Sequence, residues 1–119
     1  MTKSEAERIG RKMKTRLGKG WEIHIHENIG WWVKATRGPL YVSGDIHPYK
    51  KDKITYSCLM SSDPKNYPNW GEMYWTTHGK SFSDPQNAVK HQIKVAKEFT
   101  NNLNTVVKEA SVISSDFNN

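Results

Sequence analysis

The sequence predicts an α+β fold with an N-terminal helix, an antiparallel sheet of about five strands and a long C-terminal helix, both helices packing on one face of the sheet. Two observations predict this fold. Apolar residues recur at three- and four-residue steps near both ends of the chain, as on one face of a helix. Between Trp21 and Met60 they alternate with polar residues, as in strands. The 119 residues suit one domain, expected over residues 1–110, and residues 111–119 are expected to form a short polar tail.

The first helix is expected from Glu5 to Leu17. Ser4 and Glu7 have the spacing of a capping box, in which a hydroxyl and a carboxylate bond backbone amides at the helix start. Gly18 would end the helix, because glycine adopts the left-handed conformation that closes helices. Four apolar residues share one face that should pack on the sheet: Ala6, Ile9, Met13 and Leu17.

Three antiparallel strands are predicted between Trp21 and His47. In the first strand the isoleucines point to the core and the histidines point away from it. The Asn28-Ile29-Gly30 segment is typical of a hairpin loop with Gly30 in the left-handed conformation. This loop length sets the register, because it fixes which residues face each other. The expected pairs are Ile25 with Val33 and Ile23 with Ala35 on the core face, and His26 with Trp32 and His24 with Lys34 on the outer face.

A second tight turn is expected near Arg37-Gly38. After it, Leu40, Val42 and Ile46 would face the core, and Gly44 would leave room for the Trp31 ring. The outward residues of this third strand would be Tyr41, Ser43, Asp45 and His47.

The second half of the sheet is predicted from alternation again. A fourth strand is expected from Lys53 to Met60, followed by a turn-rich loop over Ser61 to Gly71. A short fifth strand, Glu72 to Thr77, would pair with the fourth.

The C-terminal helix has the clearest signals. Asp84 would cap it, and Pro85 would occupy the first turn, where a missing amide costs nothing. Its apolar stripe is too long for a small sheet, so we expect an overhang that could pair with a second copy in a homodimer. The stripe consists of Val89, Ile93, Ala96, Phe99, Leu103, Val107 and Ala110.

Basic charge is concentrated at the N-terminus. The chain has 18 Lys and Arg against 12 Asp and Glu, a net charge of +6. Residues 1–20 carry seven basic and two acidic side chains, so 7 − 2 = +5 of that excess. Arg8, Lys12 and Arg16 form a ridge beside the apolar stripe, with Arg11 facing elsewhere. This distribution favours an anionic partner, although excess lysine can also serve solubility alone.

The sequence offers little for catalysis. The single cysteine, Cys58, excludes an internal disulfide and four-thiolate zinc sites, and its alternation predicts a buried position. His24 and His26 could chelate a metal from one strand, but Asp45 and His47 would lie roughly 10 Å away across the middle strand. No nucleophile-base pair or phosphate-binding loop is evident. We therefore expect no cofactor and no enzyme, with a metal-dependent hydrolase using His24 and His26 as a minor alternative.

The outer face of the sheet is the remaining candidate. Trp32 and Tyr41 would lie there among His24, His26 and Lys34, and rings interleaved with cations can stack on bases or hold arginines of a partner. Alternatively, the loop Ser61 to Gly71 or a second copy could cover this face, which would make Trp32 part of a core.

The string GWEIHIHENIGWWVKA, followed by alternating strands and a helix opened by Asp-Pro, resembles small uncharacterised proteins of phages and other mobile elements over about Gly20 to Lys97. The resemblance implies an accessory role and assigns no reaction or site residue. The order of helix, strands and helix is also similar to double-stranded-RNA-binding domains. However, the extra strand pair and the lack of a lysine cluster at the opening of the last helix depart from that family.

The expected function is therefore a small, basic, non-enzymatic binding module that engages nucleic acid or an acidic protein surface. Its expected binding residues are Arg8, Arg11, Lys12, Arg16, His24, His26, Trp32, Lys34 and Tyr41. The main alternative is an inhibitor or adaptor that acts by protein–protein contact. The sequence has no apolar run long enough for a membrane span, so no membrane contact and a cytoplasmic location are expected.

Overall fold

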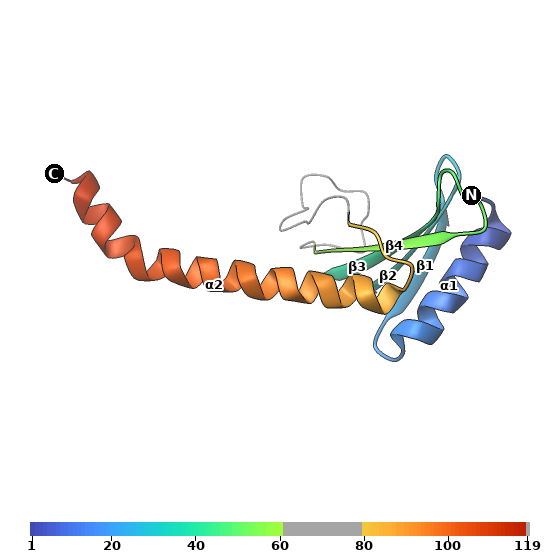
Figure 1. The fold of residues 1–119 in the computed structure, drawn as a ribbon, viewed down its shortest axis with the longest axis horizontal. Helices are drawn as coiled ribbons and strands as arrows, with labels where there is room; N and C mark the ends of the chain where they lie inside the picture. Colours follow the sequence, from blue (N-terminus) through green and yellow to red (C-terminus); the bar gives the residue numbers. More distant parts are fainter. Residues whose placement is uncertain (61–79, 119) are drawn as a thin grey trace.

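The computed structural model describes residues 1–60 and 80–118 (Figure 1). This part of the chain forms two helices and one antiparallel sheet, in the predicted α+β class. The elements are α1 (Lys3–Leu17), β1 (Glu22–Glu27), β2 (Trp31–Arg37), β3 (Leu40–Ile46), β4 (Ile54–Met60) and α2 (Pro85–Phe117).

The strands follow one another in the order β1-β2-β3-β4, and each pairs antiparallel with its neighbour. The predicted register is confirmed: Ile25 faces Val33 and His26 faces Trp32. In the loop between them, Ile29 and Gly30 have φ of 50° and 108°, and the Asn28 amide donates to the Gly30 carbonyl at 2.7 Å. The loop conformation therefore fixes which side chains reach each face, as its length predicted.

The predicted fifth strand, Glu72 to Thr77, lies outside the described residues. Within them the sheet has four strands rather than five. Among the described residues, β4 also has a backbone partner in Phe82, on the edge away from β3. Its amide donates to the Tyr56 carbonyl at 2.8 Å, and the Tyr56 amide donates back at 2.7 Å. The chain thus returns along β4 immediately before α2 begins.

The start of α1 differs from the prediction. Thr2 caps the helix, and its hydroxyl accepts from the Glu5 amide while the Glu5 carboxylate accepts from the Thr2 amide. Both Thr2 with Glu5 and Ser4 with Glu7 have capping-box spacing. The earlier pair is selected, and the Met1 carbonyl before it accepts from the Trp31 amide at 3.3 Å. The earlier start of α1 therefore coincides with this hydrogen bond between Met1 and Trp31 of β2.

The core lies between the sheet and α1, where the predicted stripe of Ala6, Ile9 and Met13 is fully buried. Gly44 in β3 permits this close packing. A Cβ placed on Gly44 would lie 2.5 Å from Cγ2 of Ile9. The expected neighbour Trp31 is thus replaced by Ile9, because α1 crosses the sheet at this glycine.

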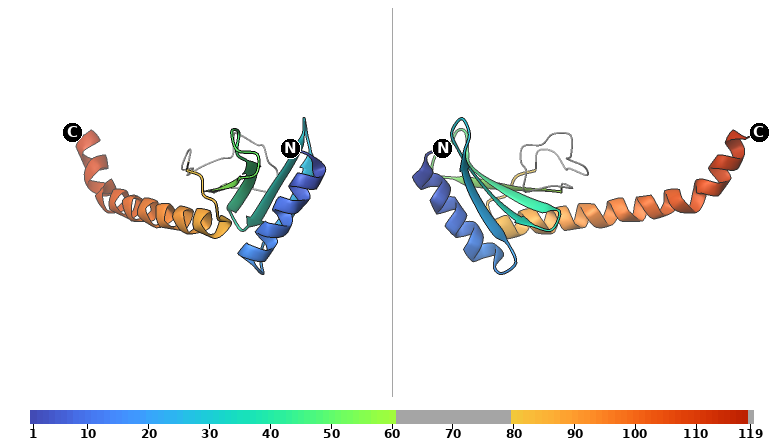
Figure 2. Two further views of the ribbon diagram at one scale, coloured as in Figure 1. Left: turned by 45° about the vertical axis from the view of Figure 1, so that its right-hand side comes forward. Right: turned by 180° about the vertical axis from the view of Figure 1, so that it is seen from behind.

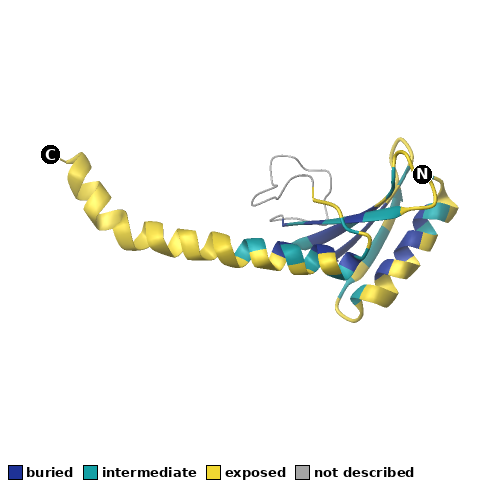
Figure 3. Ribbon diagram, viewed as in Figure 1, coloured by how far each residue is buried: buried dark blue, intermediate teal, exposed yellow. Residues whose placement is uncertain are grey.

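The second helix begins where predicted, with Asp84 as cap and Pro85 in the first turn. Its first turns pack against β3, β4 and α1 on the face of the sheet that α1 covers (Figure 2). The helix continues to Phe117, so most of the expected tail, residues 111–119, is helical. Beyond Ala96 it is exposed and extends away from the sheet (Figure 3). The predicted overhang is therefore present.

Candidate functional site

The exposed basic side chains of α1 form the candidate site. The buried stripe turns one side of α1 to the sheet, which leaves Arg8 and Arg11 on the opposite side in solvent. Among the described residues, neither guanidinium has an ion-pair or hydrogen-bond partner. Lys14 is likewise exposed. Within residues 1–60 and 80–118, an anion could therefore bind these three cations without breaking an ion pair.

Two further lysines of α1 lie over aromatic rings. Nζ of Lys12 is 5.7 Å from the centre of the Tyr56 ring, and Nζ of Lys3 is 5.6 Å from that of Trp31. A cation over an aromatic face is attracted to the ring electrons. Lys12 thus helps to cover Tyr56, a role that sequence periodicity could not reveal, while its ammonium remains exposed.

Arg16 has a different role from its neighbours on the predicted ridge. Its guanidinium forms an ion pair with Asp84 and donates to Oε1 of Gln86 at 3.2 Å, and the Gln86 amide nitrogen donates to the Arg16 carbonyl. The Asp84 bond raises the pKa of Arg16, and the Arg16 bond lowers the pKa of Asp84. Arg16 therefore joins the end of α1 to the start of α2, and its role in binding stays a prediction.

The sequence left open whether the outer face of the sheet is exposed or covered. Lys34 and Tyr41 are only 4% and 3% exposed, which agrees with the alternative of a covered face. Trp32 is 38% exposed, and its indole nitrogen donates to the Asn28 carbonyl at 2.7 Å. The outer face is thus largely buried at β2 and β3. Lys34 and Tyr41 could contact a large partner only after a rearrangement.

The two histidines of β1 share a face, as the register requires. Nε2 of His24 lies 2.9 Å from the hydroxyl of Thr36 and 3.6 Å from a carboxylate oxygen of Glu22. Over residues 1–60 and 80–118, no three histidine, cysteine or acidic side chains converge on a point that could hold a metal ion. The described residues therefore give the hydrolase alternative no metal site.

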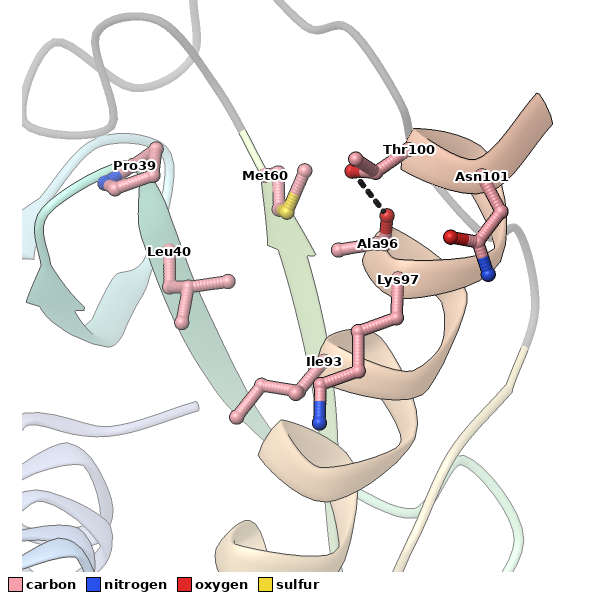
Figure 4. A pocket seen from close by; sticks show the side chains of 8 residues that line it. All are labelled: Pro39, Leu40, Met60, Ile93, Ala96, Lys97, Thr100 and Asn101. Carbon is pink, nitrogen blue, oxygen red and sulfur yellow. Dashed lines mark hydrogen bonds between the residues drawn. The ribbon is translucent and has the colours of Figure 1, made fainter. Parts of the chain in front are cut away.

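Sequence reasoning missed an apolar hollow where α2 leaves the sheet. Its volume is about 490 Å³, and Leu40 and Met60 face Ile93 and Ala96 across it (Figure 4). Lys97 lies at its edge. The overhang of α2 was predictable from its length, but the hollow depends on where the helix crosses β3 and β4.

Comparisons with known proteins found no match for this chain among family models, curated proteins or solved structures. In the described part of the chain, neither helix combines the length and the apolar character that a membrane span requires.

Proposed function

We propose that this protein is a small non-enzymatic binding module whose α1 surface engages an anionic partner. The surface consists of Arg8, Arg11, Lys12 and Lys14. Support comes from its geometry: the apolar side of α1 is buried in the core, and Arg8 and Arg11 project from the other side without acidic partners among the described residues. Because the helix backbone is already ordered, binding immobilises only the side chains of this surface.

Nucleic acid is the partner that we favour, because its backbone presents anionic phosphates at regular spacing. Arginine and lysine contacts to phosphate release condensed counterions, so the affinity falls steeply as salt increases. A partner of this kind needs no deep pocket. An acidic protein surface is the alternative, and an inhibitor or adaptor would act through such a contact.

The test is fluorescence anisotropy with single-stranded and double-stranded DNA and RNA probes, over about 50 to 200 mM salt. We expect binding whose logarithmic salt slope decreases by about 2 in the Arg8→Ala/Arg11→Ala variant, because two phosphate contacts are lost. Lys50→Ala/Lys51→Ala is the matched control, since it removes the same charge from an exposed turn. Equal slopes in both variants, or no binding to any probe, would reject nucleic acid.

We also propose that a second copy of the chain is a partner, which would pair through the overhang of α2. Leu103 and Val106 are 46% and 59% exposed there. Apolar side chains in such a row are costly in water.

A further inference from the structure

The apolar side chains of α2 follow one unbroken spacing. Steps of three and four residues alternate from Ala96 to Phe117, a repeat of seven residues. The positions after the helix leaves the sheet are all apolar: Ala96, Phe99, Leu103, Val106, Ala110, Ile113 and Phe117. A strict seven-residue repeat is typical of helices that supercoil around each other. The turns of α2 before this seam pack on the sheet, whereas the seam itself extends beyond it (Figure 3).

We propose that this seam pairs with α2 of a second copy in an antiparallel coiled coil, in which the partner's Phe117 occupies the hollow beside Ile93. This inference does not depend on whether the α1 surface binds an anion.

Side-chain sizes select the antiparallel direction and one register. If Leu103 faces the partner's Val106, then Phe99 faces the partner's Ala110 and Ala96 faces the partner's Ile113. Each layer then combines a large side chain with a smaller one, which interdigitated packing requires. A parallel pair would instead oppose Phe99 with the partner's Phe99 and Ala110 with the partner's Ala110. The phenylalanine layer would then hold too much side-chain volume, and the alanine layer would leave a cavity.

The same register brings the end of α2 to the hollow. Phe117 is 83% exposed, and the hollow is lined by apolar side chains that include Leu40, Met60 and Ile93. Counting along the register, the partner's Phe117 lies at the level of Gln92, which is buried within its own copy, and one residue from Ile93, which is 41% exposed and lines the hollow. A shift by one repeat would pair Phe99 with the partner's Phe117 and would leave the hollow unfilled. The hollow therefore supports the first register independently of the layers.

Charge favours the same arrangement. Residues 97–117 contain two lysines and three acidic side chains, so 2 − 3 = −1, whereas residues 1–20 carry +5. In an antiparallel pair, the length of the overhang, about 30 Å, separates the two basic N-terminal regions. This distance is several times the length over which salt screens charges. It also places the negative end of one helix and Asp116 near Lys94 and Lys97 of the partner subunit. A parallel pair would bring the two basic regions together.

The surface area that the two helices would bury predicts a weak dimer. A seam about 30 Å long and about 10 Å wide covers ~300 Å² on each copy in projection. Interdigitation and the two Phe117 rings raise the buried accessible area to ~1,000 Å², near the lower limit for specific interfaces. We therefore expect a dissociation constant on the order of 10 μM.

Sedimentation velocity of the full chain, from about 1 to about 200 μM, tests pairing around this value. We expect a concentration-dependent shift from monomer to dimer, which Leu103→Glu abolishes. Ser115→Glu is the control, since it adds the same charge on the helix face opposite the seam. Val106→Glu gives a second disruption, and circular dichroism checks that each variant keeps its helix. A monomer at every concentration would overturn the proposal, and so would a monomer that sediments with lipid vesicles instead of pairing. Equal loss of the dimer in Ser115→Glu would overturn it as well.

Cysteine cross-linking tests the direction in a Cys58→Ala background. Mixed Ala96→Cys and Ile113→Cys proteins should form a disulfide heterodimer, because these positions face each other in the proposed register. Ala110→Cys alone should cross-link poorly, since Phe99 of the partner subunit lies opposite. Efficient cross-linking of Ala110→Cys, without the heterodimer, would show parallel pairing and reject the proposed geometry.

Discussion

The guanidinium of Arg16, near the end of α1, donates to the carboxylate of Asp84, the residue that caps α2. The two residues are 68 positions apart in the chain. Asp84 therefore has two tasks, because its other oxygen accepts from the Gln86 amide at 2.9 Å. The pair joins the two helices, which both pack on the same face of the sheet.

Substitutions of Arg16 and Asp84 should lower the free energy of unfolding by more when they remove more of these contacts. We expect Asp84→Ala to be the most destabilising, because it removes both the cap and the ion pair. Asp84→Asn keeps an amide oxygen that can cap the helix, and Arg16→Ala removes only the exposed pair, which contributes little by itself. Urea denaturation should give the lowest midpoint for Asp84→Ala. A lower midpoint for Arg16→Ala would show that the pair matters more than the cap.

The Arg16 bond also makes stability depend on acidity. It lowers the pKa of Asp84 below the ordinary value of 3.8, so the folded state binds this proton more weakly than the unfolded state. The contribution of Asp84 is present above the unfolded pKa and is lost as the pH falls through the folded pKa. The stability difference between the parent protein and Asp84→Asn should thus shrink on acidification below about pH 4. Burial raises the pKa of Asp45, but Asp45 is common to both proteins.

Gly44 should tolerate no side chain while Ile9 is present. Because an added Cβ would lie 2.5 Å from Cγ2 of Ile9, Gly44→Ala should destabilise the protein by ~1–3 kcal/mol. Ile9→Ala should cost ~2–5 kcal/mol by leaving a cavity. The double variant should lose less than the sum by ~1 kcal/mol, because the new methyl group enters that cavity. Urea denaturation of all four proteins measures this coupling, and strict additivity would contradict the close approach.

Local patterns predicted most of the fold, because alternation, loop length and the Asp-Pro start of α2 each depend on residues close in sequence. The register of β1 and β2 followed from Asn28-Ile29-Gly30 alone. The start of α1 was predicted wrongly because two possible capping boxes overlap there. The box that forms, Thr2 with Glu5, occurs together with the hydrogen bond between Met1 and Trp31. Local sequence cannot include such a contact.

The candidate site was less predictable, because burial and pairing depend on distant segments. Periodicity placed Arg8, Lys12 and Arg16 on one ridge, but it could not show that Asp84 holds Arg16. Alternation likewise assigned Lys34 and Tyr41 to one face without showing whether that face is covered. The faces of each element were therefore predictable, whereas their environments were not.

Cys58 should be inert in the folded protein. Its side chain is 5% exposed, and burial raises the pKa of its thiol to about 12. Only about one thiol in 10⁴ would ionise near pH 8, and the thiolate is the reactive form. A disulfide reagent should thus react far more slowly with the native protein than with the protein in guanidinium chloride. Equal rates would show that Cys58 is accessible in the native state.

The Tyr56 hydroxyl should contribute nothing favourable to stability. Tyr56 is fully buried between the sheet and the helices, and its hydroxyl has no hydrogen-bond partner among the described residues. A buried polar group without a partner loses its bonds to water and gains none in return. Tyr56→Phe keeps the ring under Lys12 and removes this penalty, so we expect a gain of ~1 kcal/mol in urea denaturation. Tyr49→Phe is the matched control, because Tyr49 is 91% exposed and should be neutral. A destabilised Tyr56→Phe protein would show that the hydroxyl is bonded in solution.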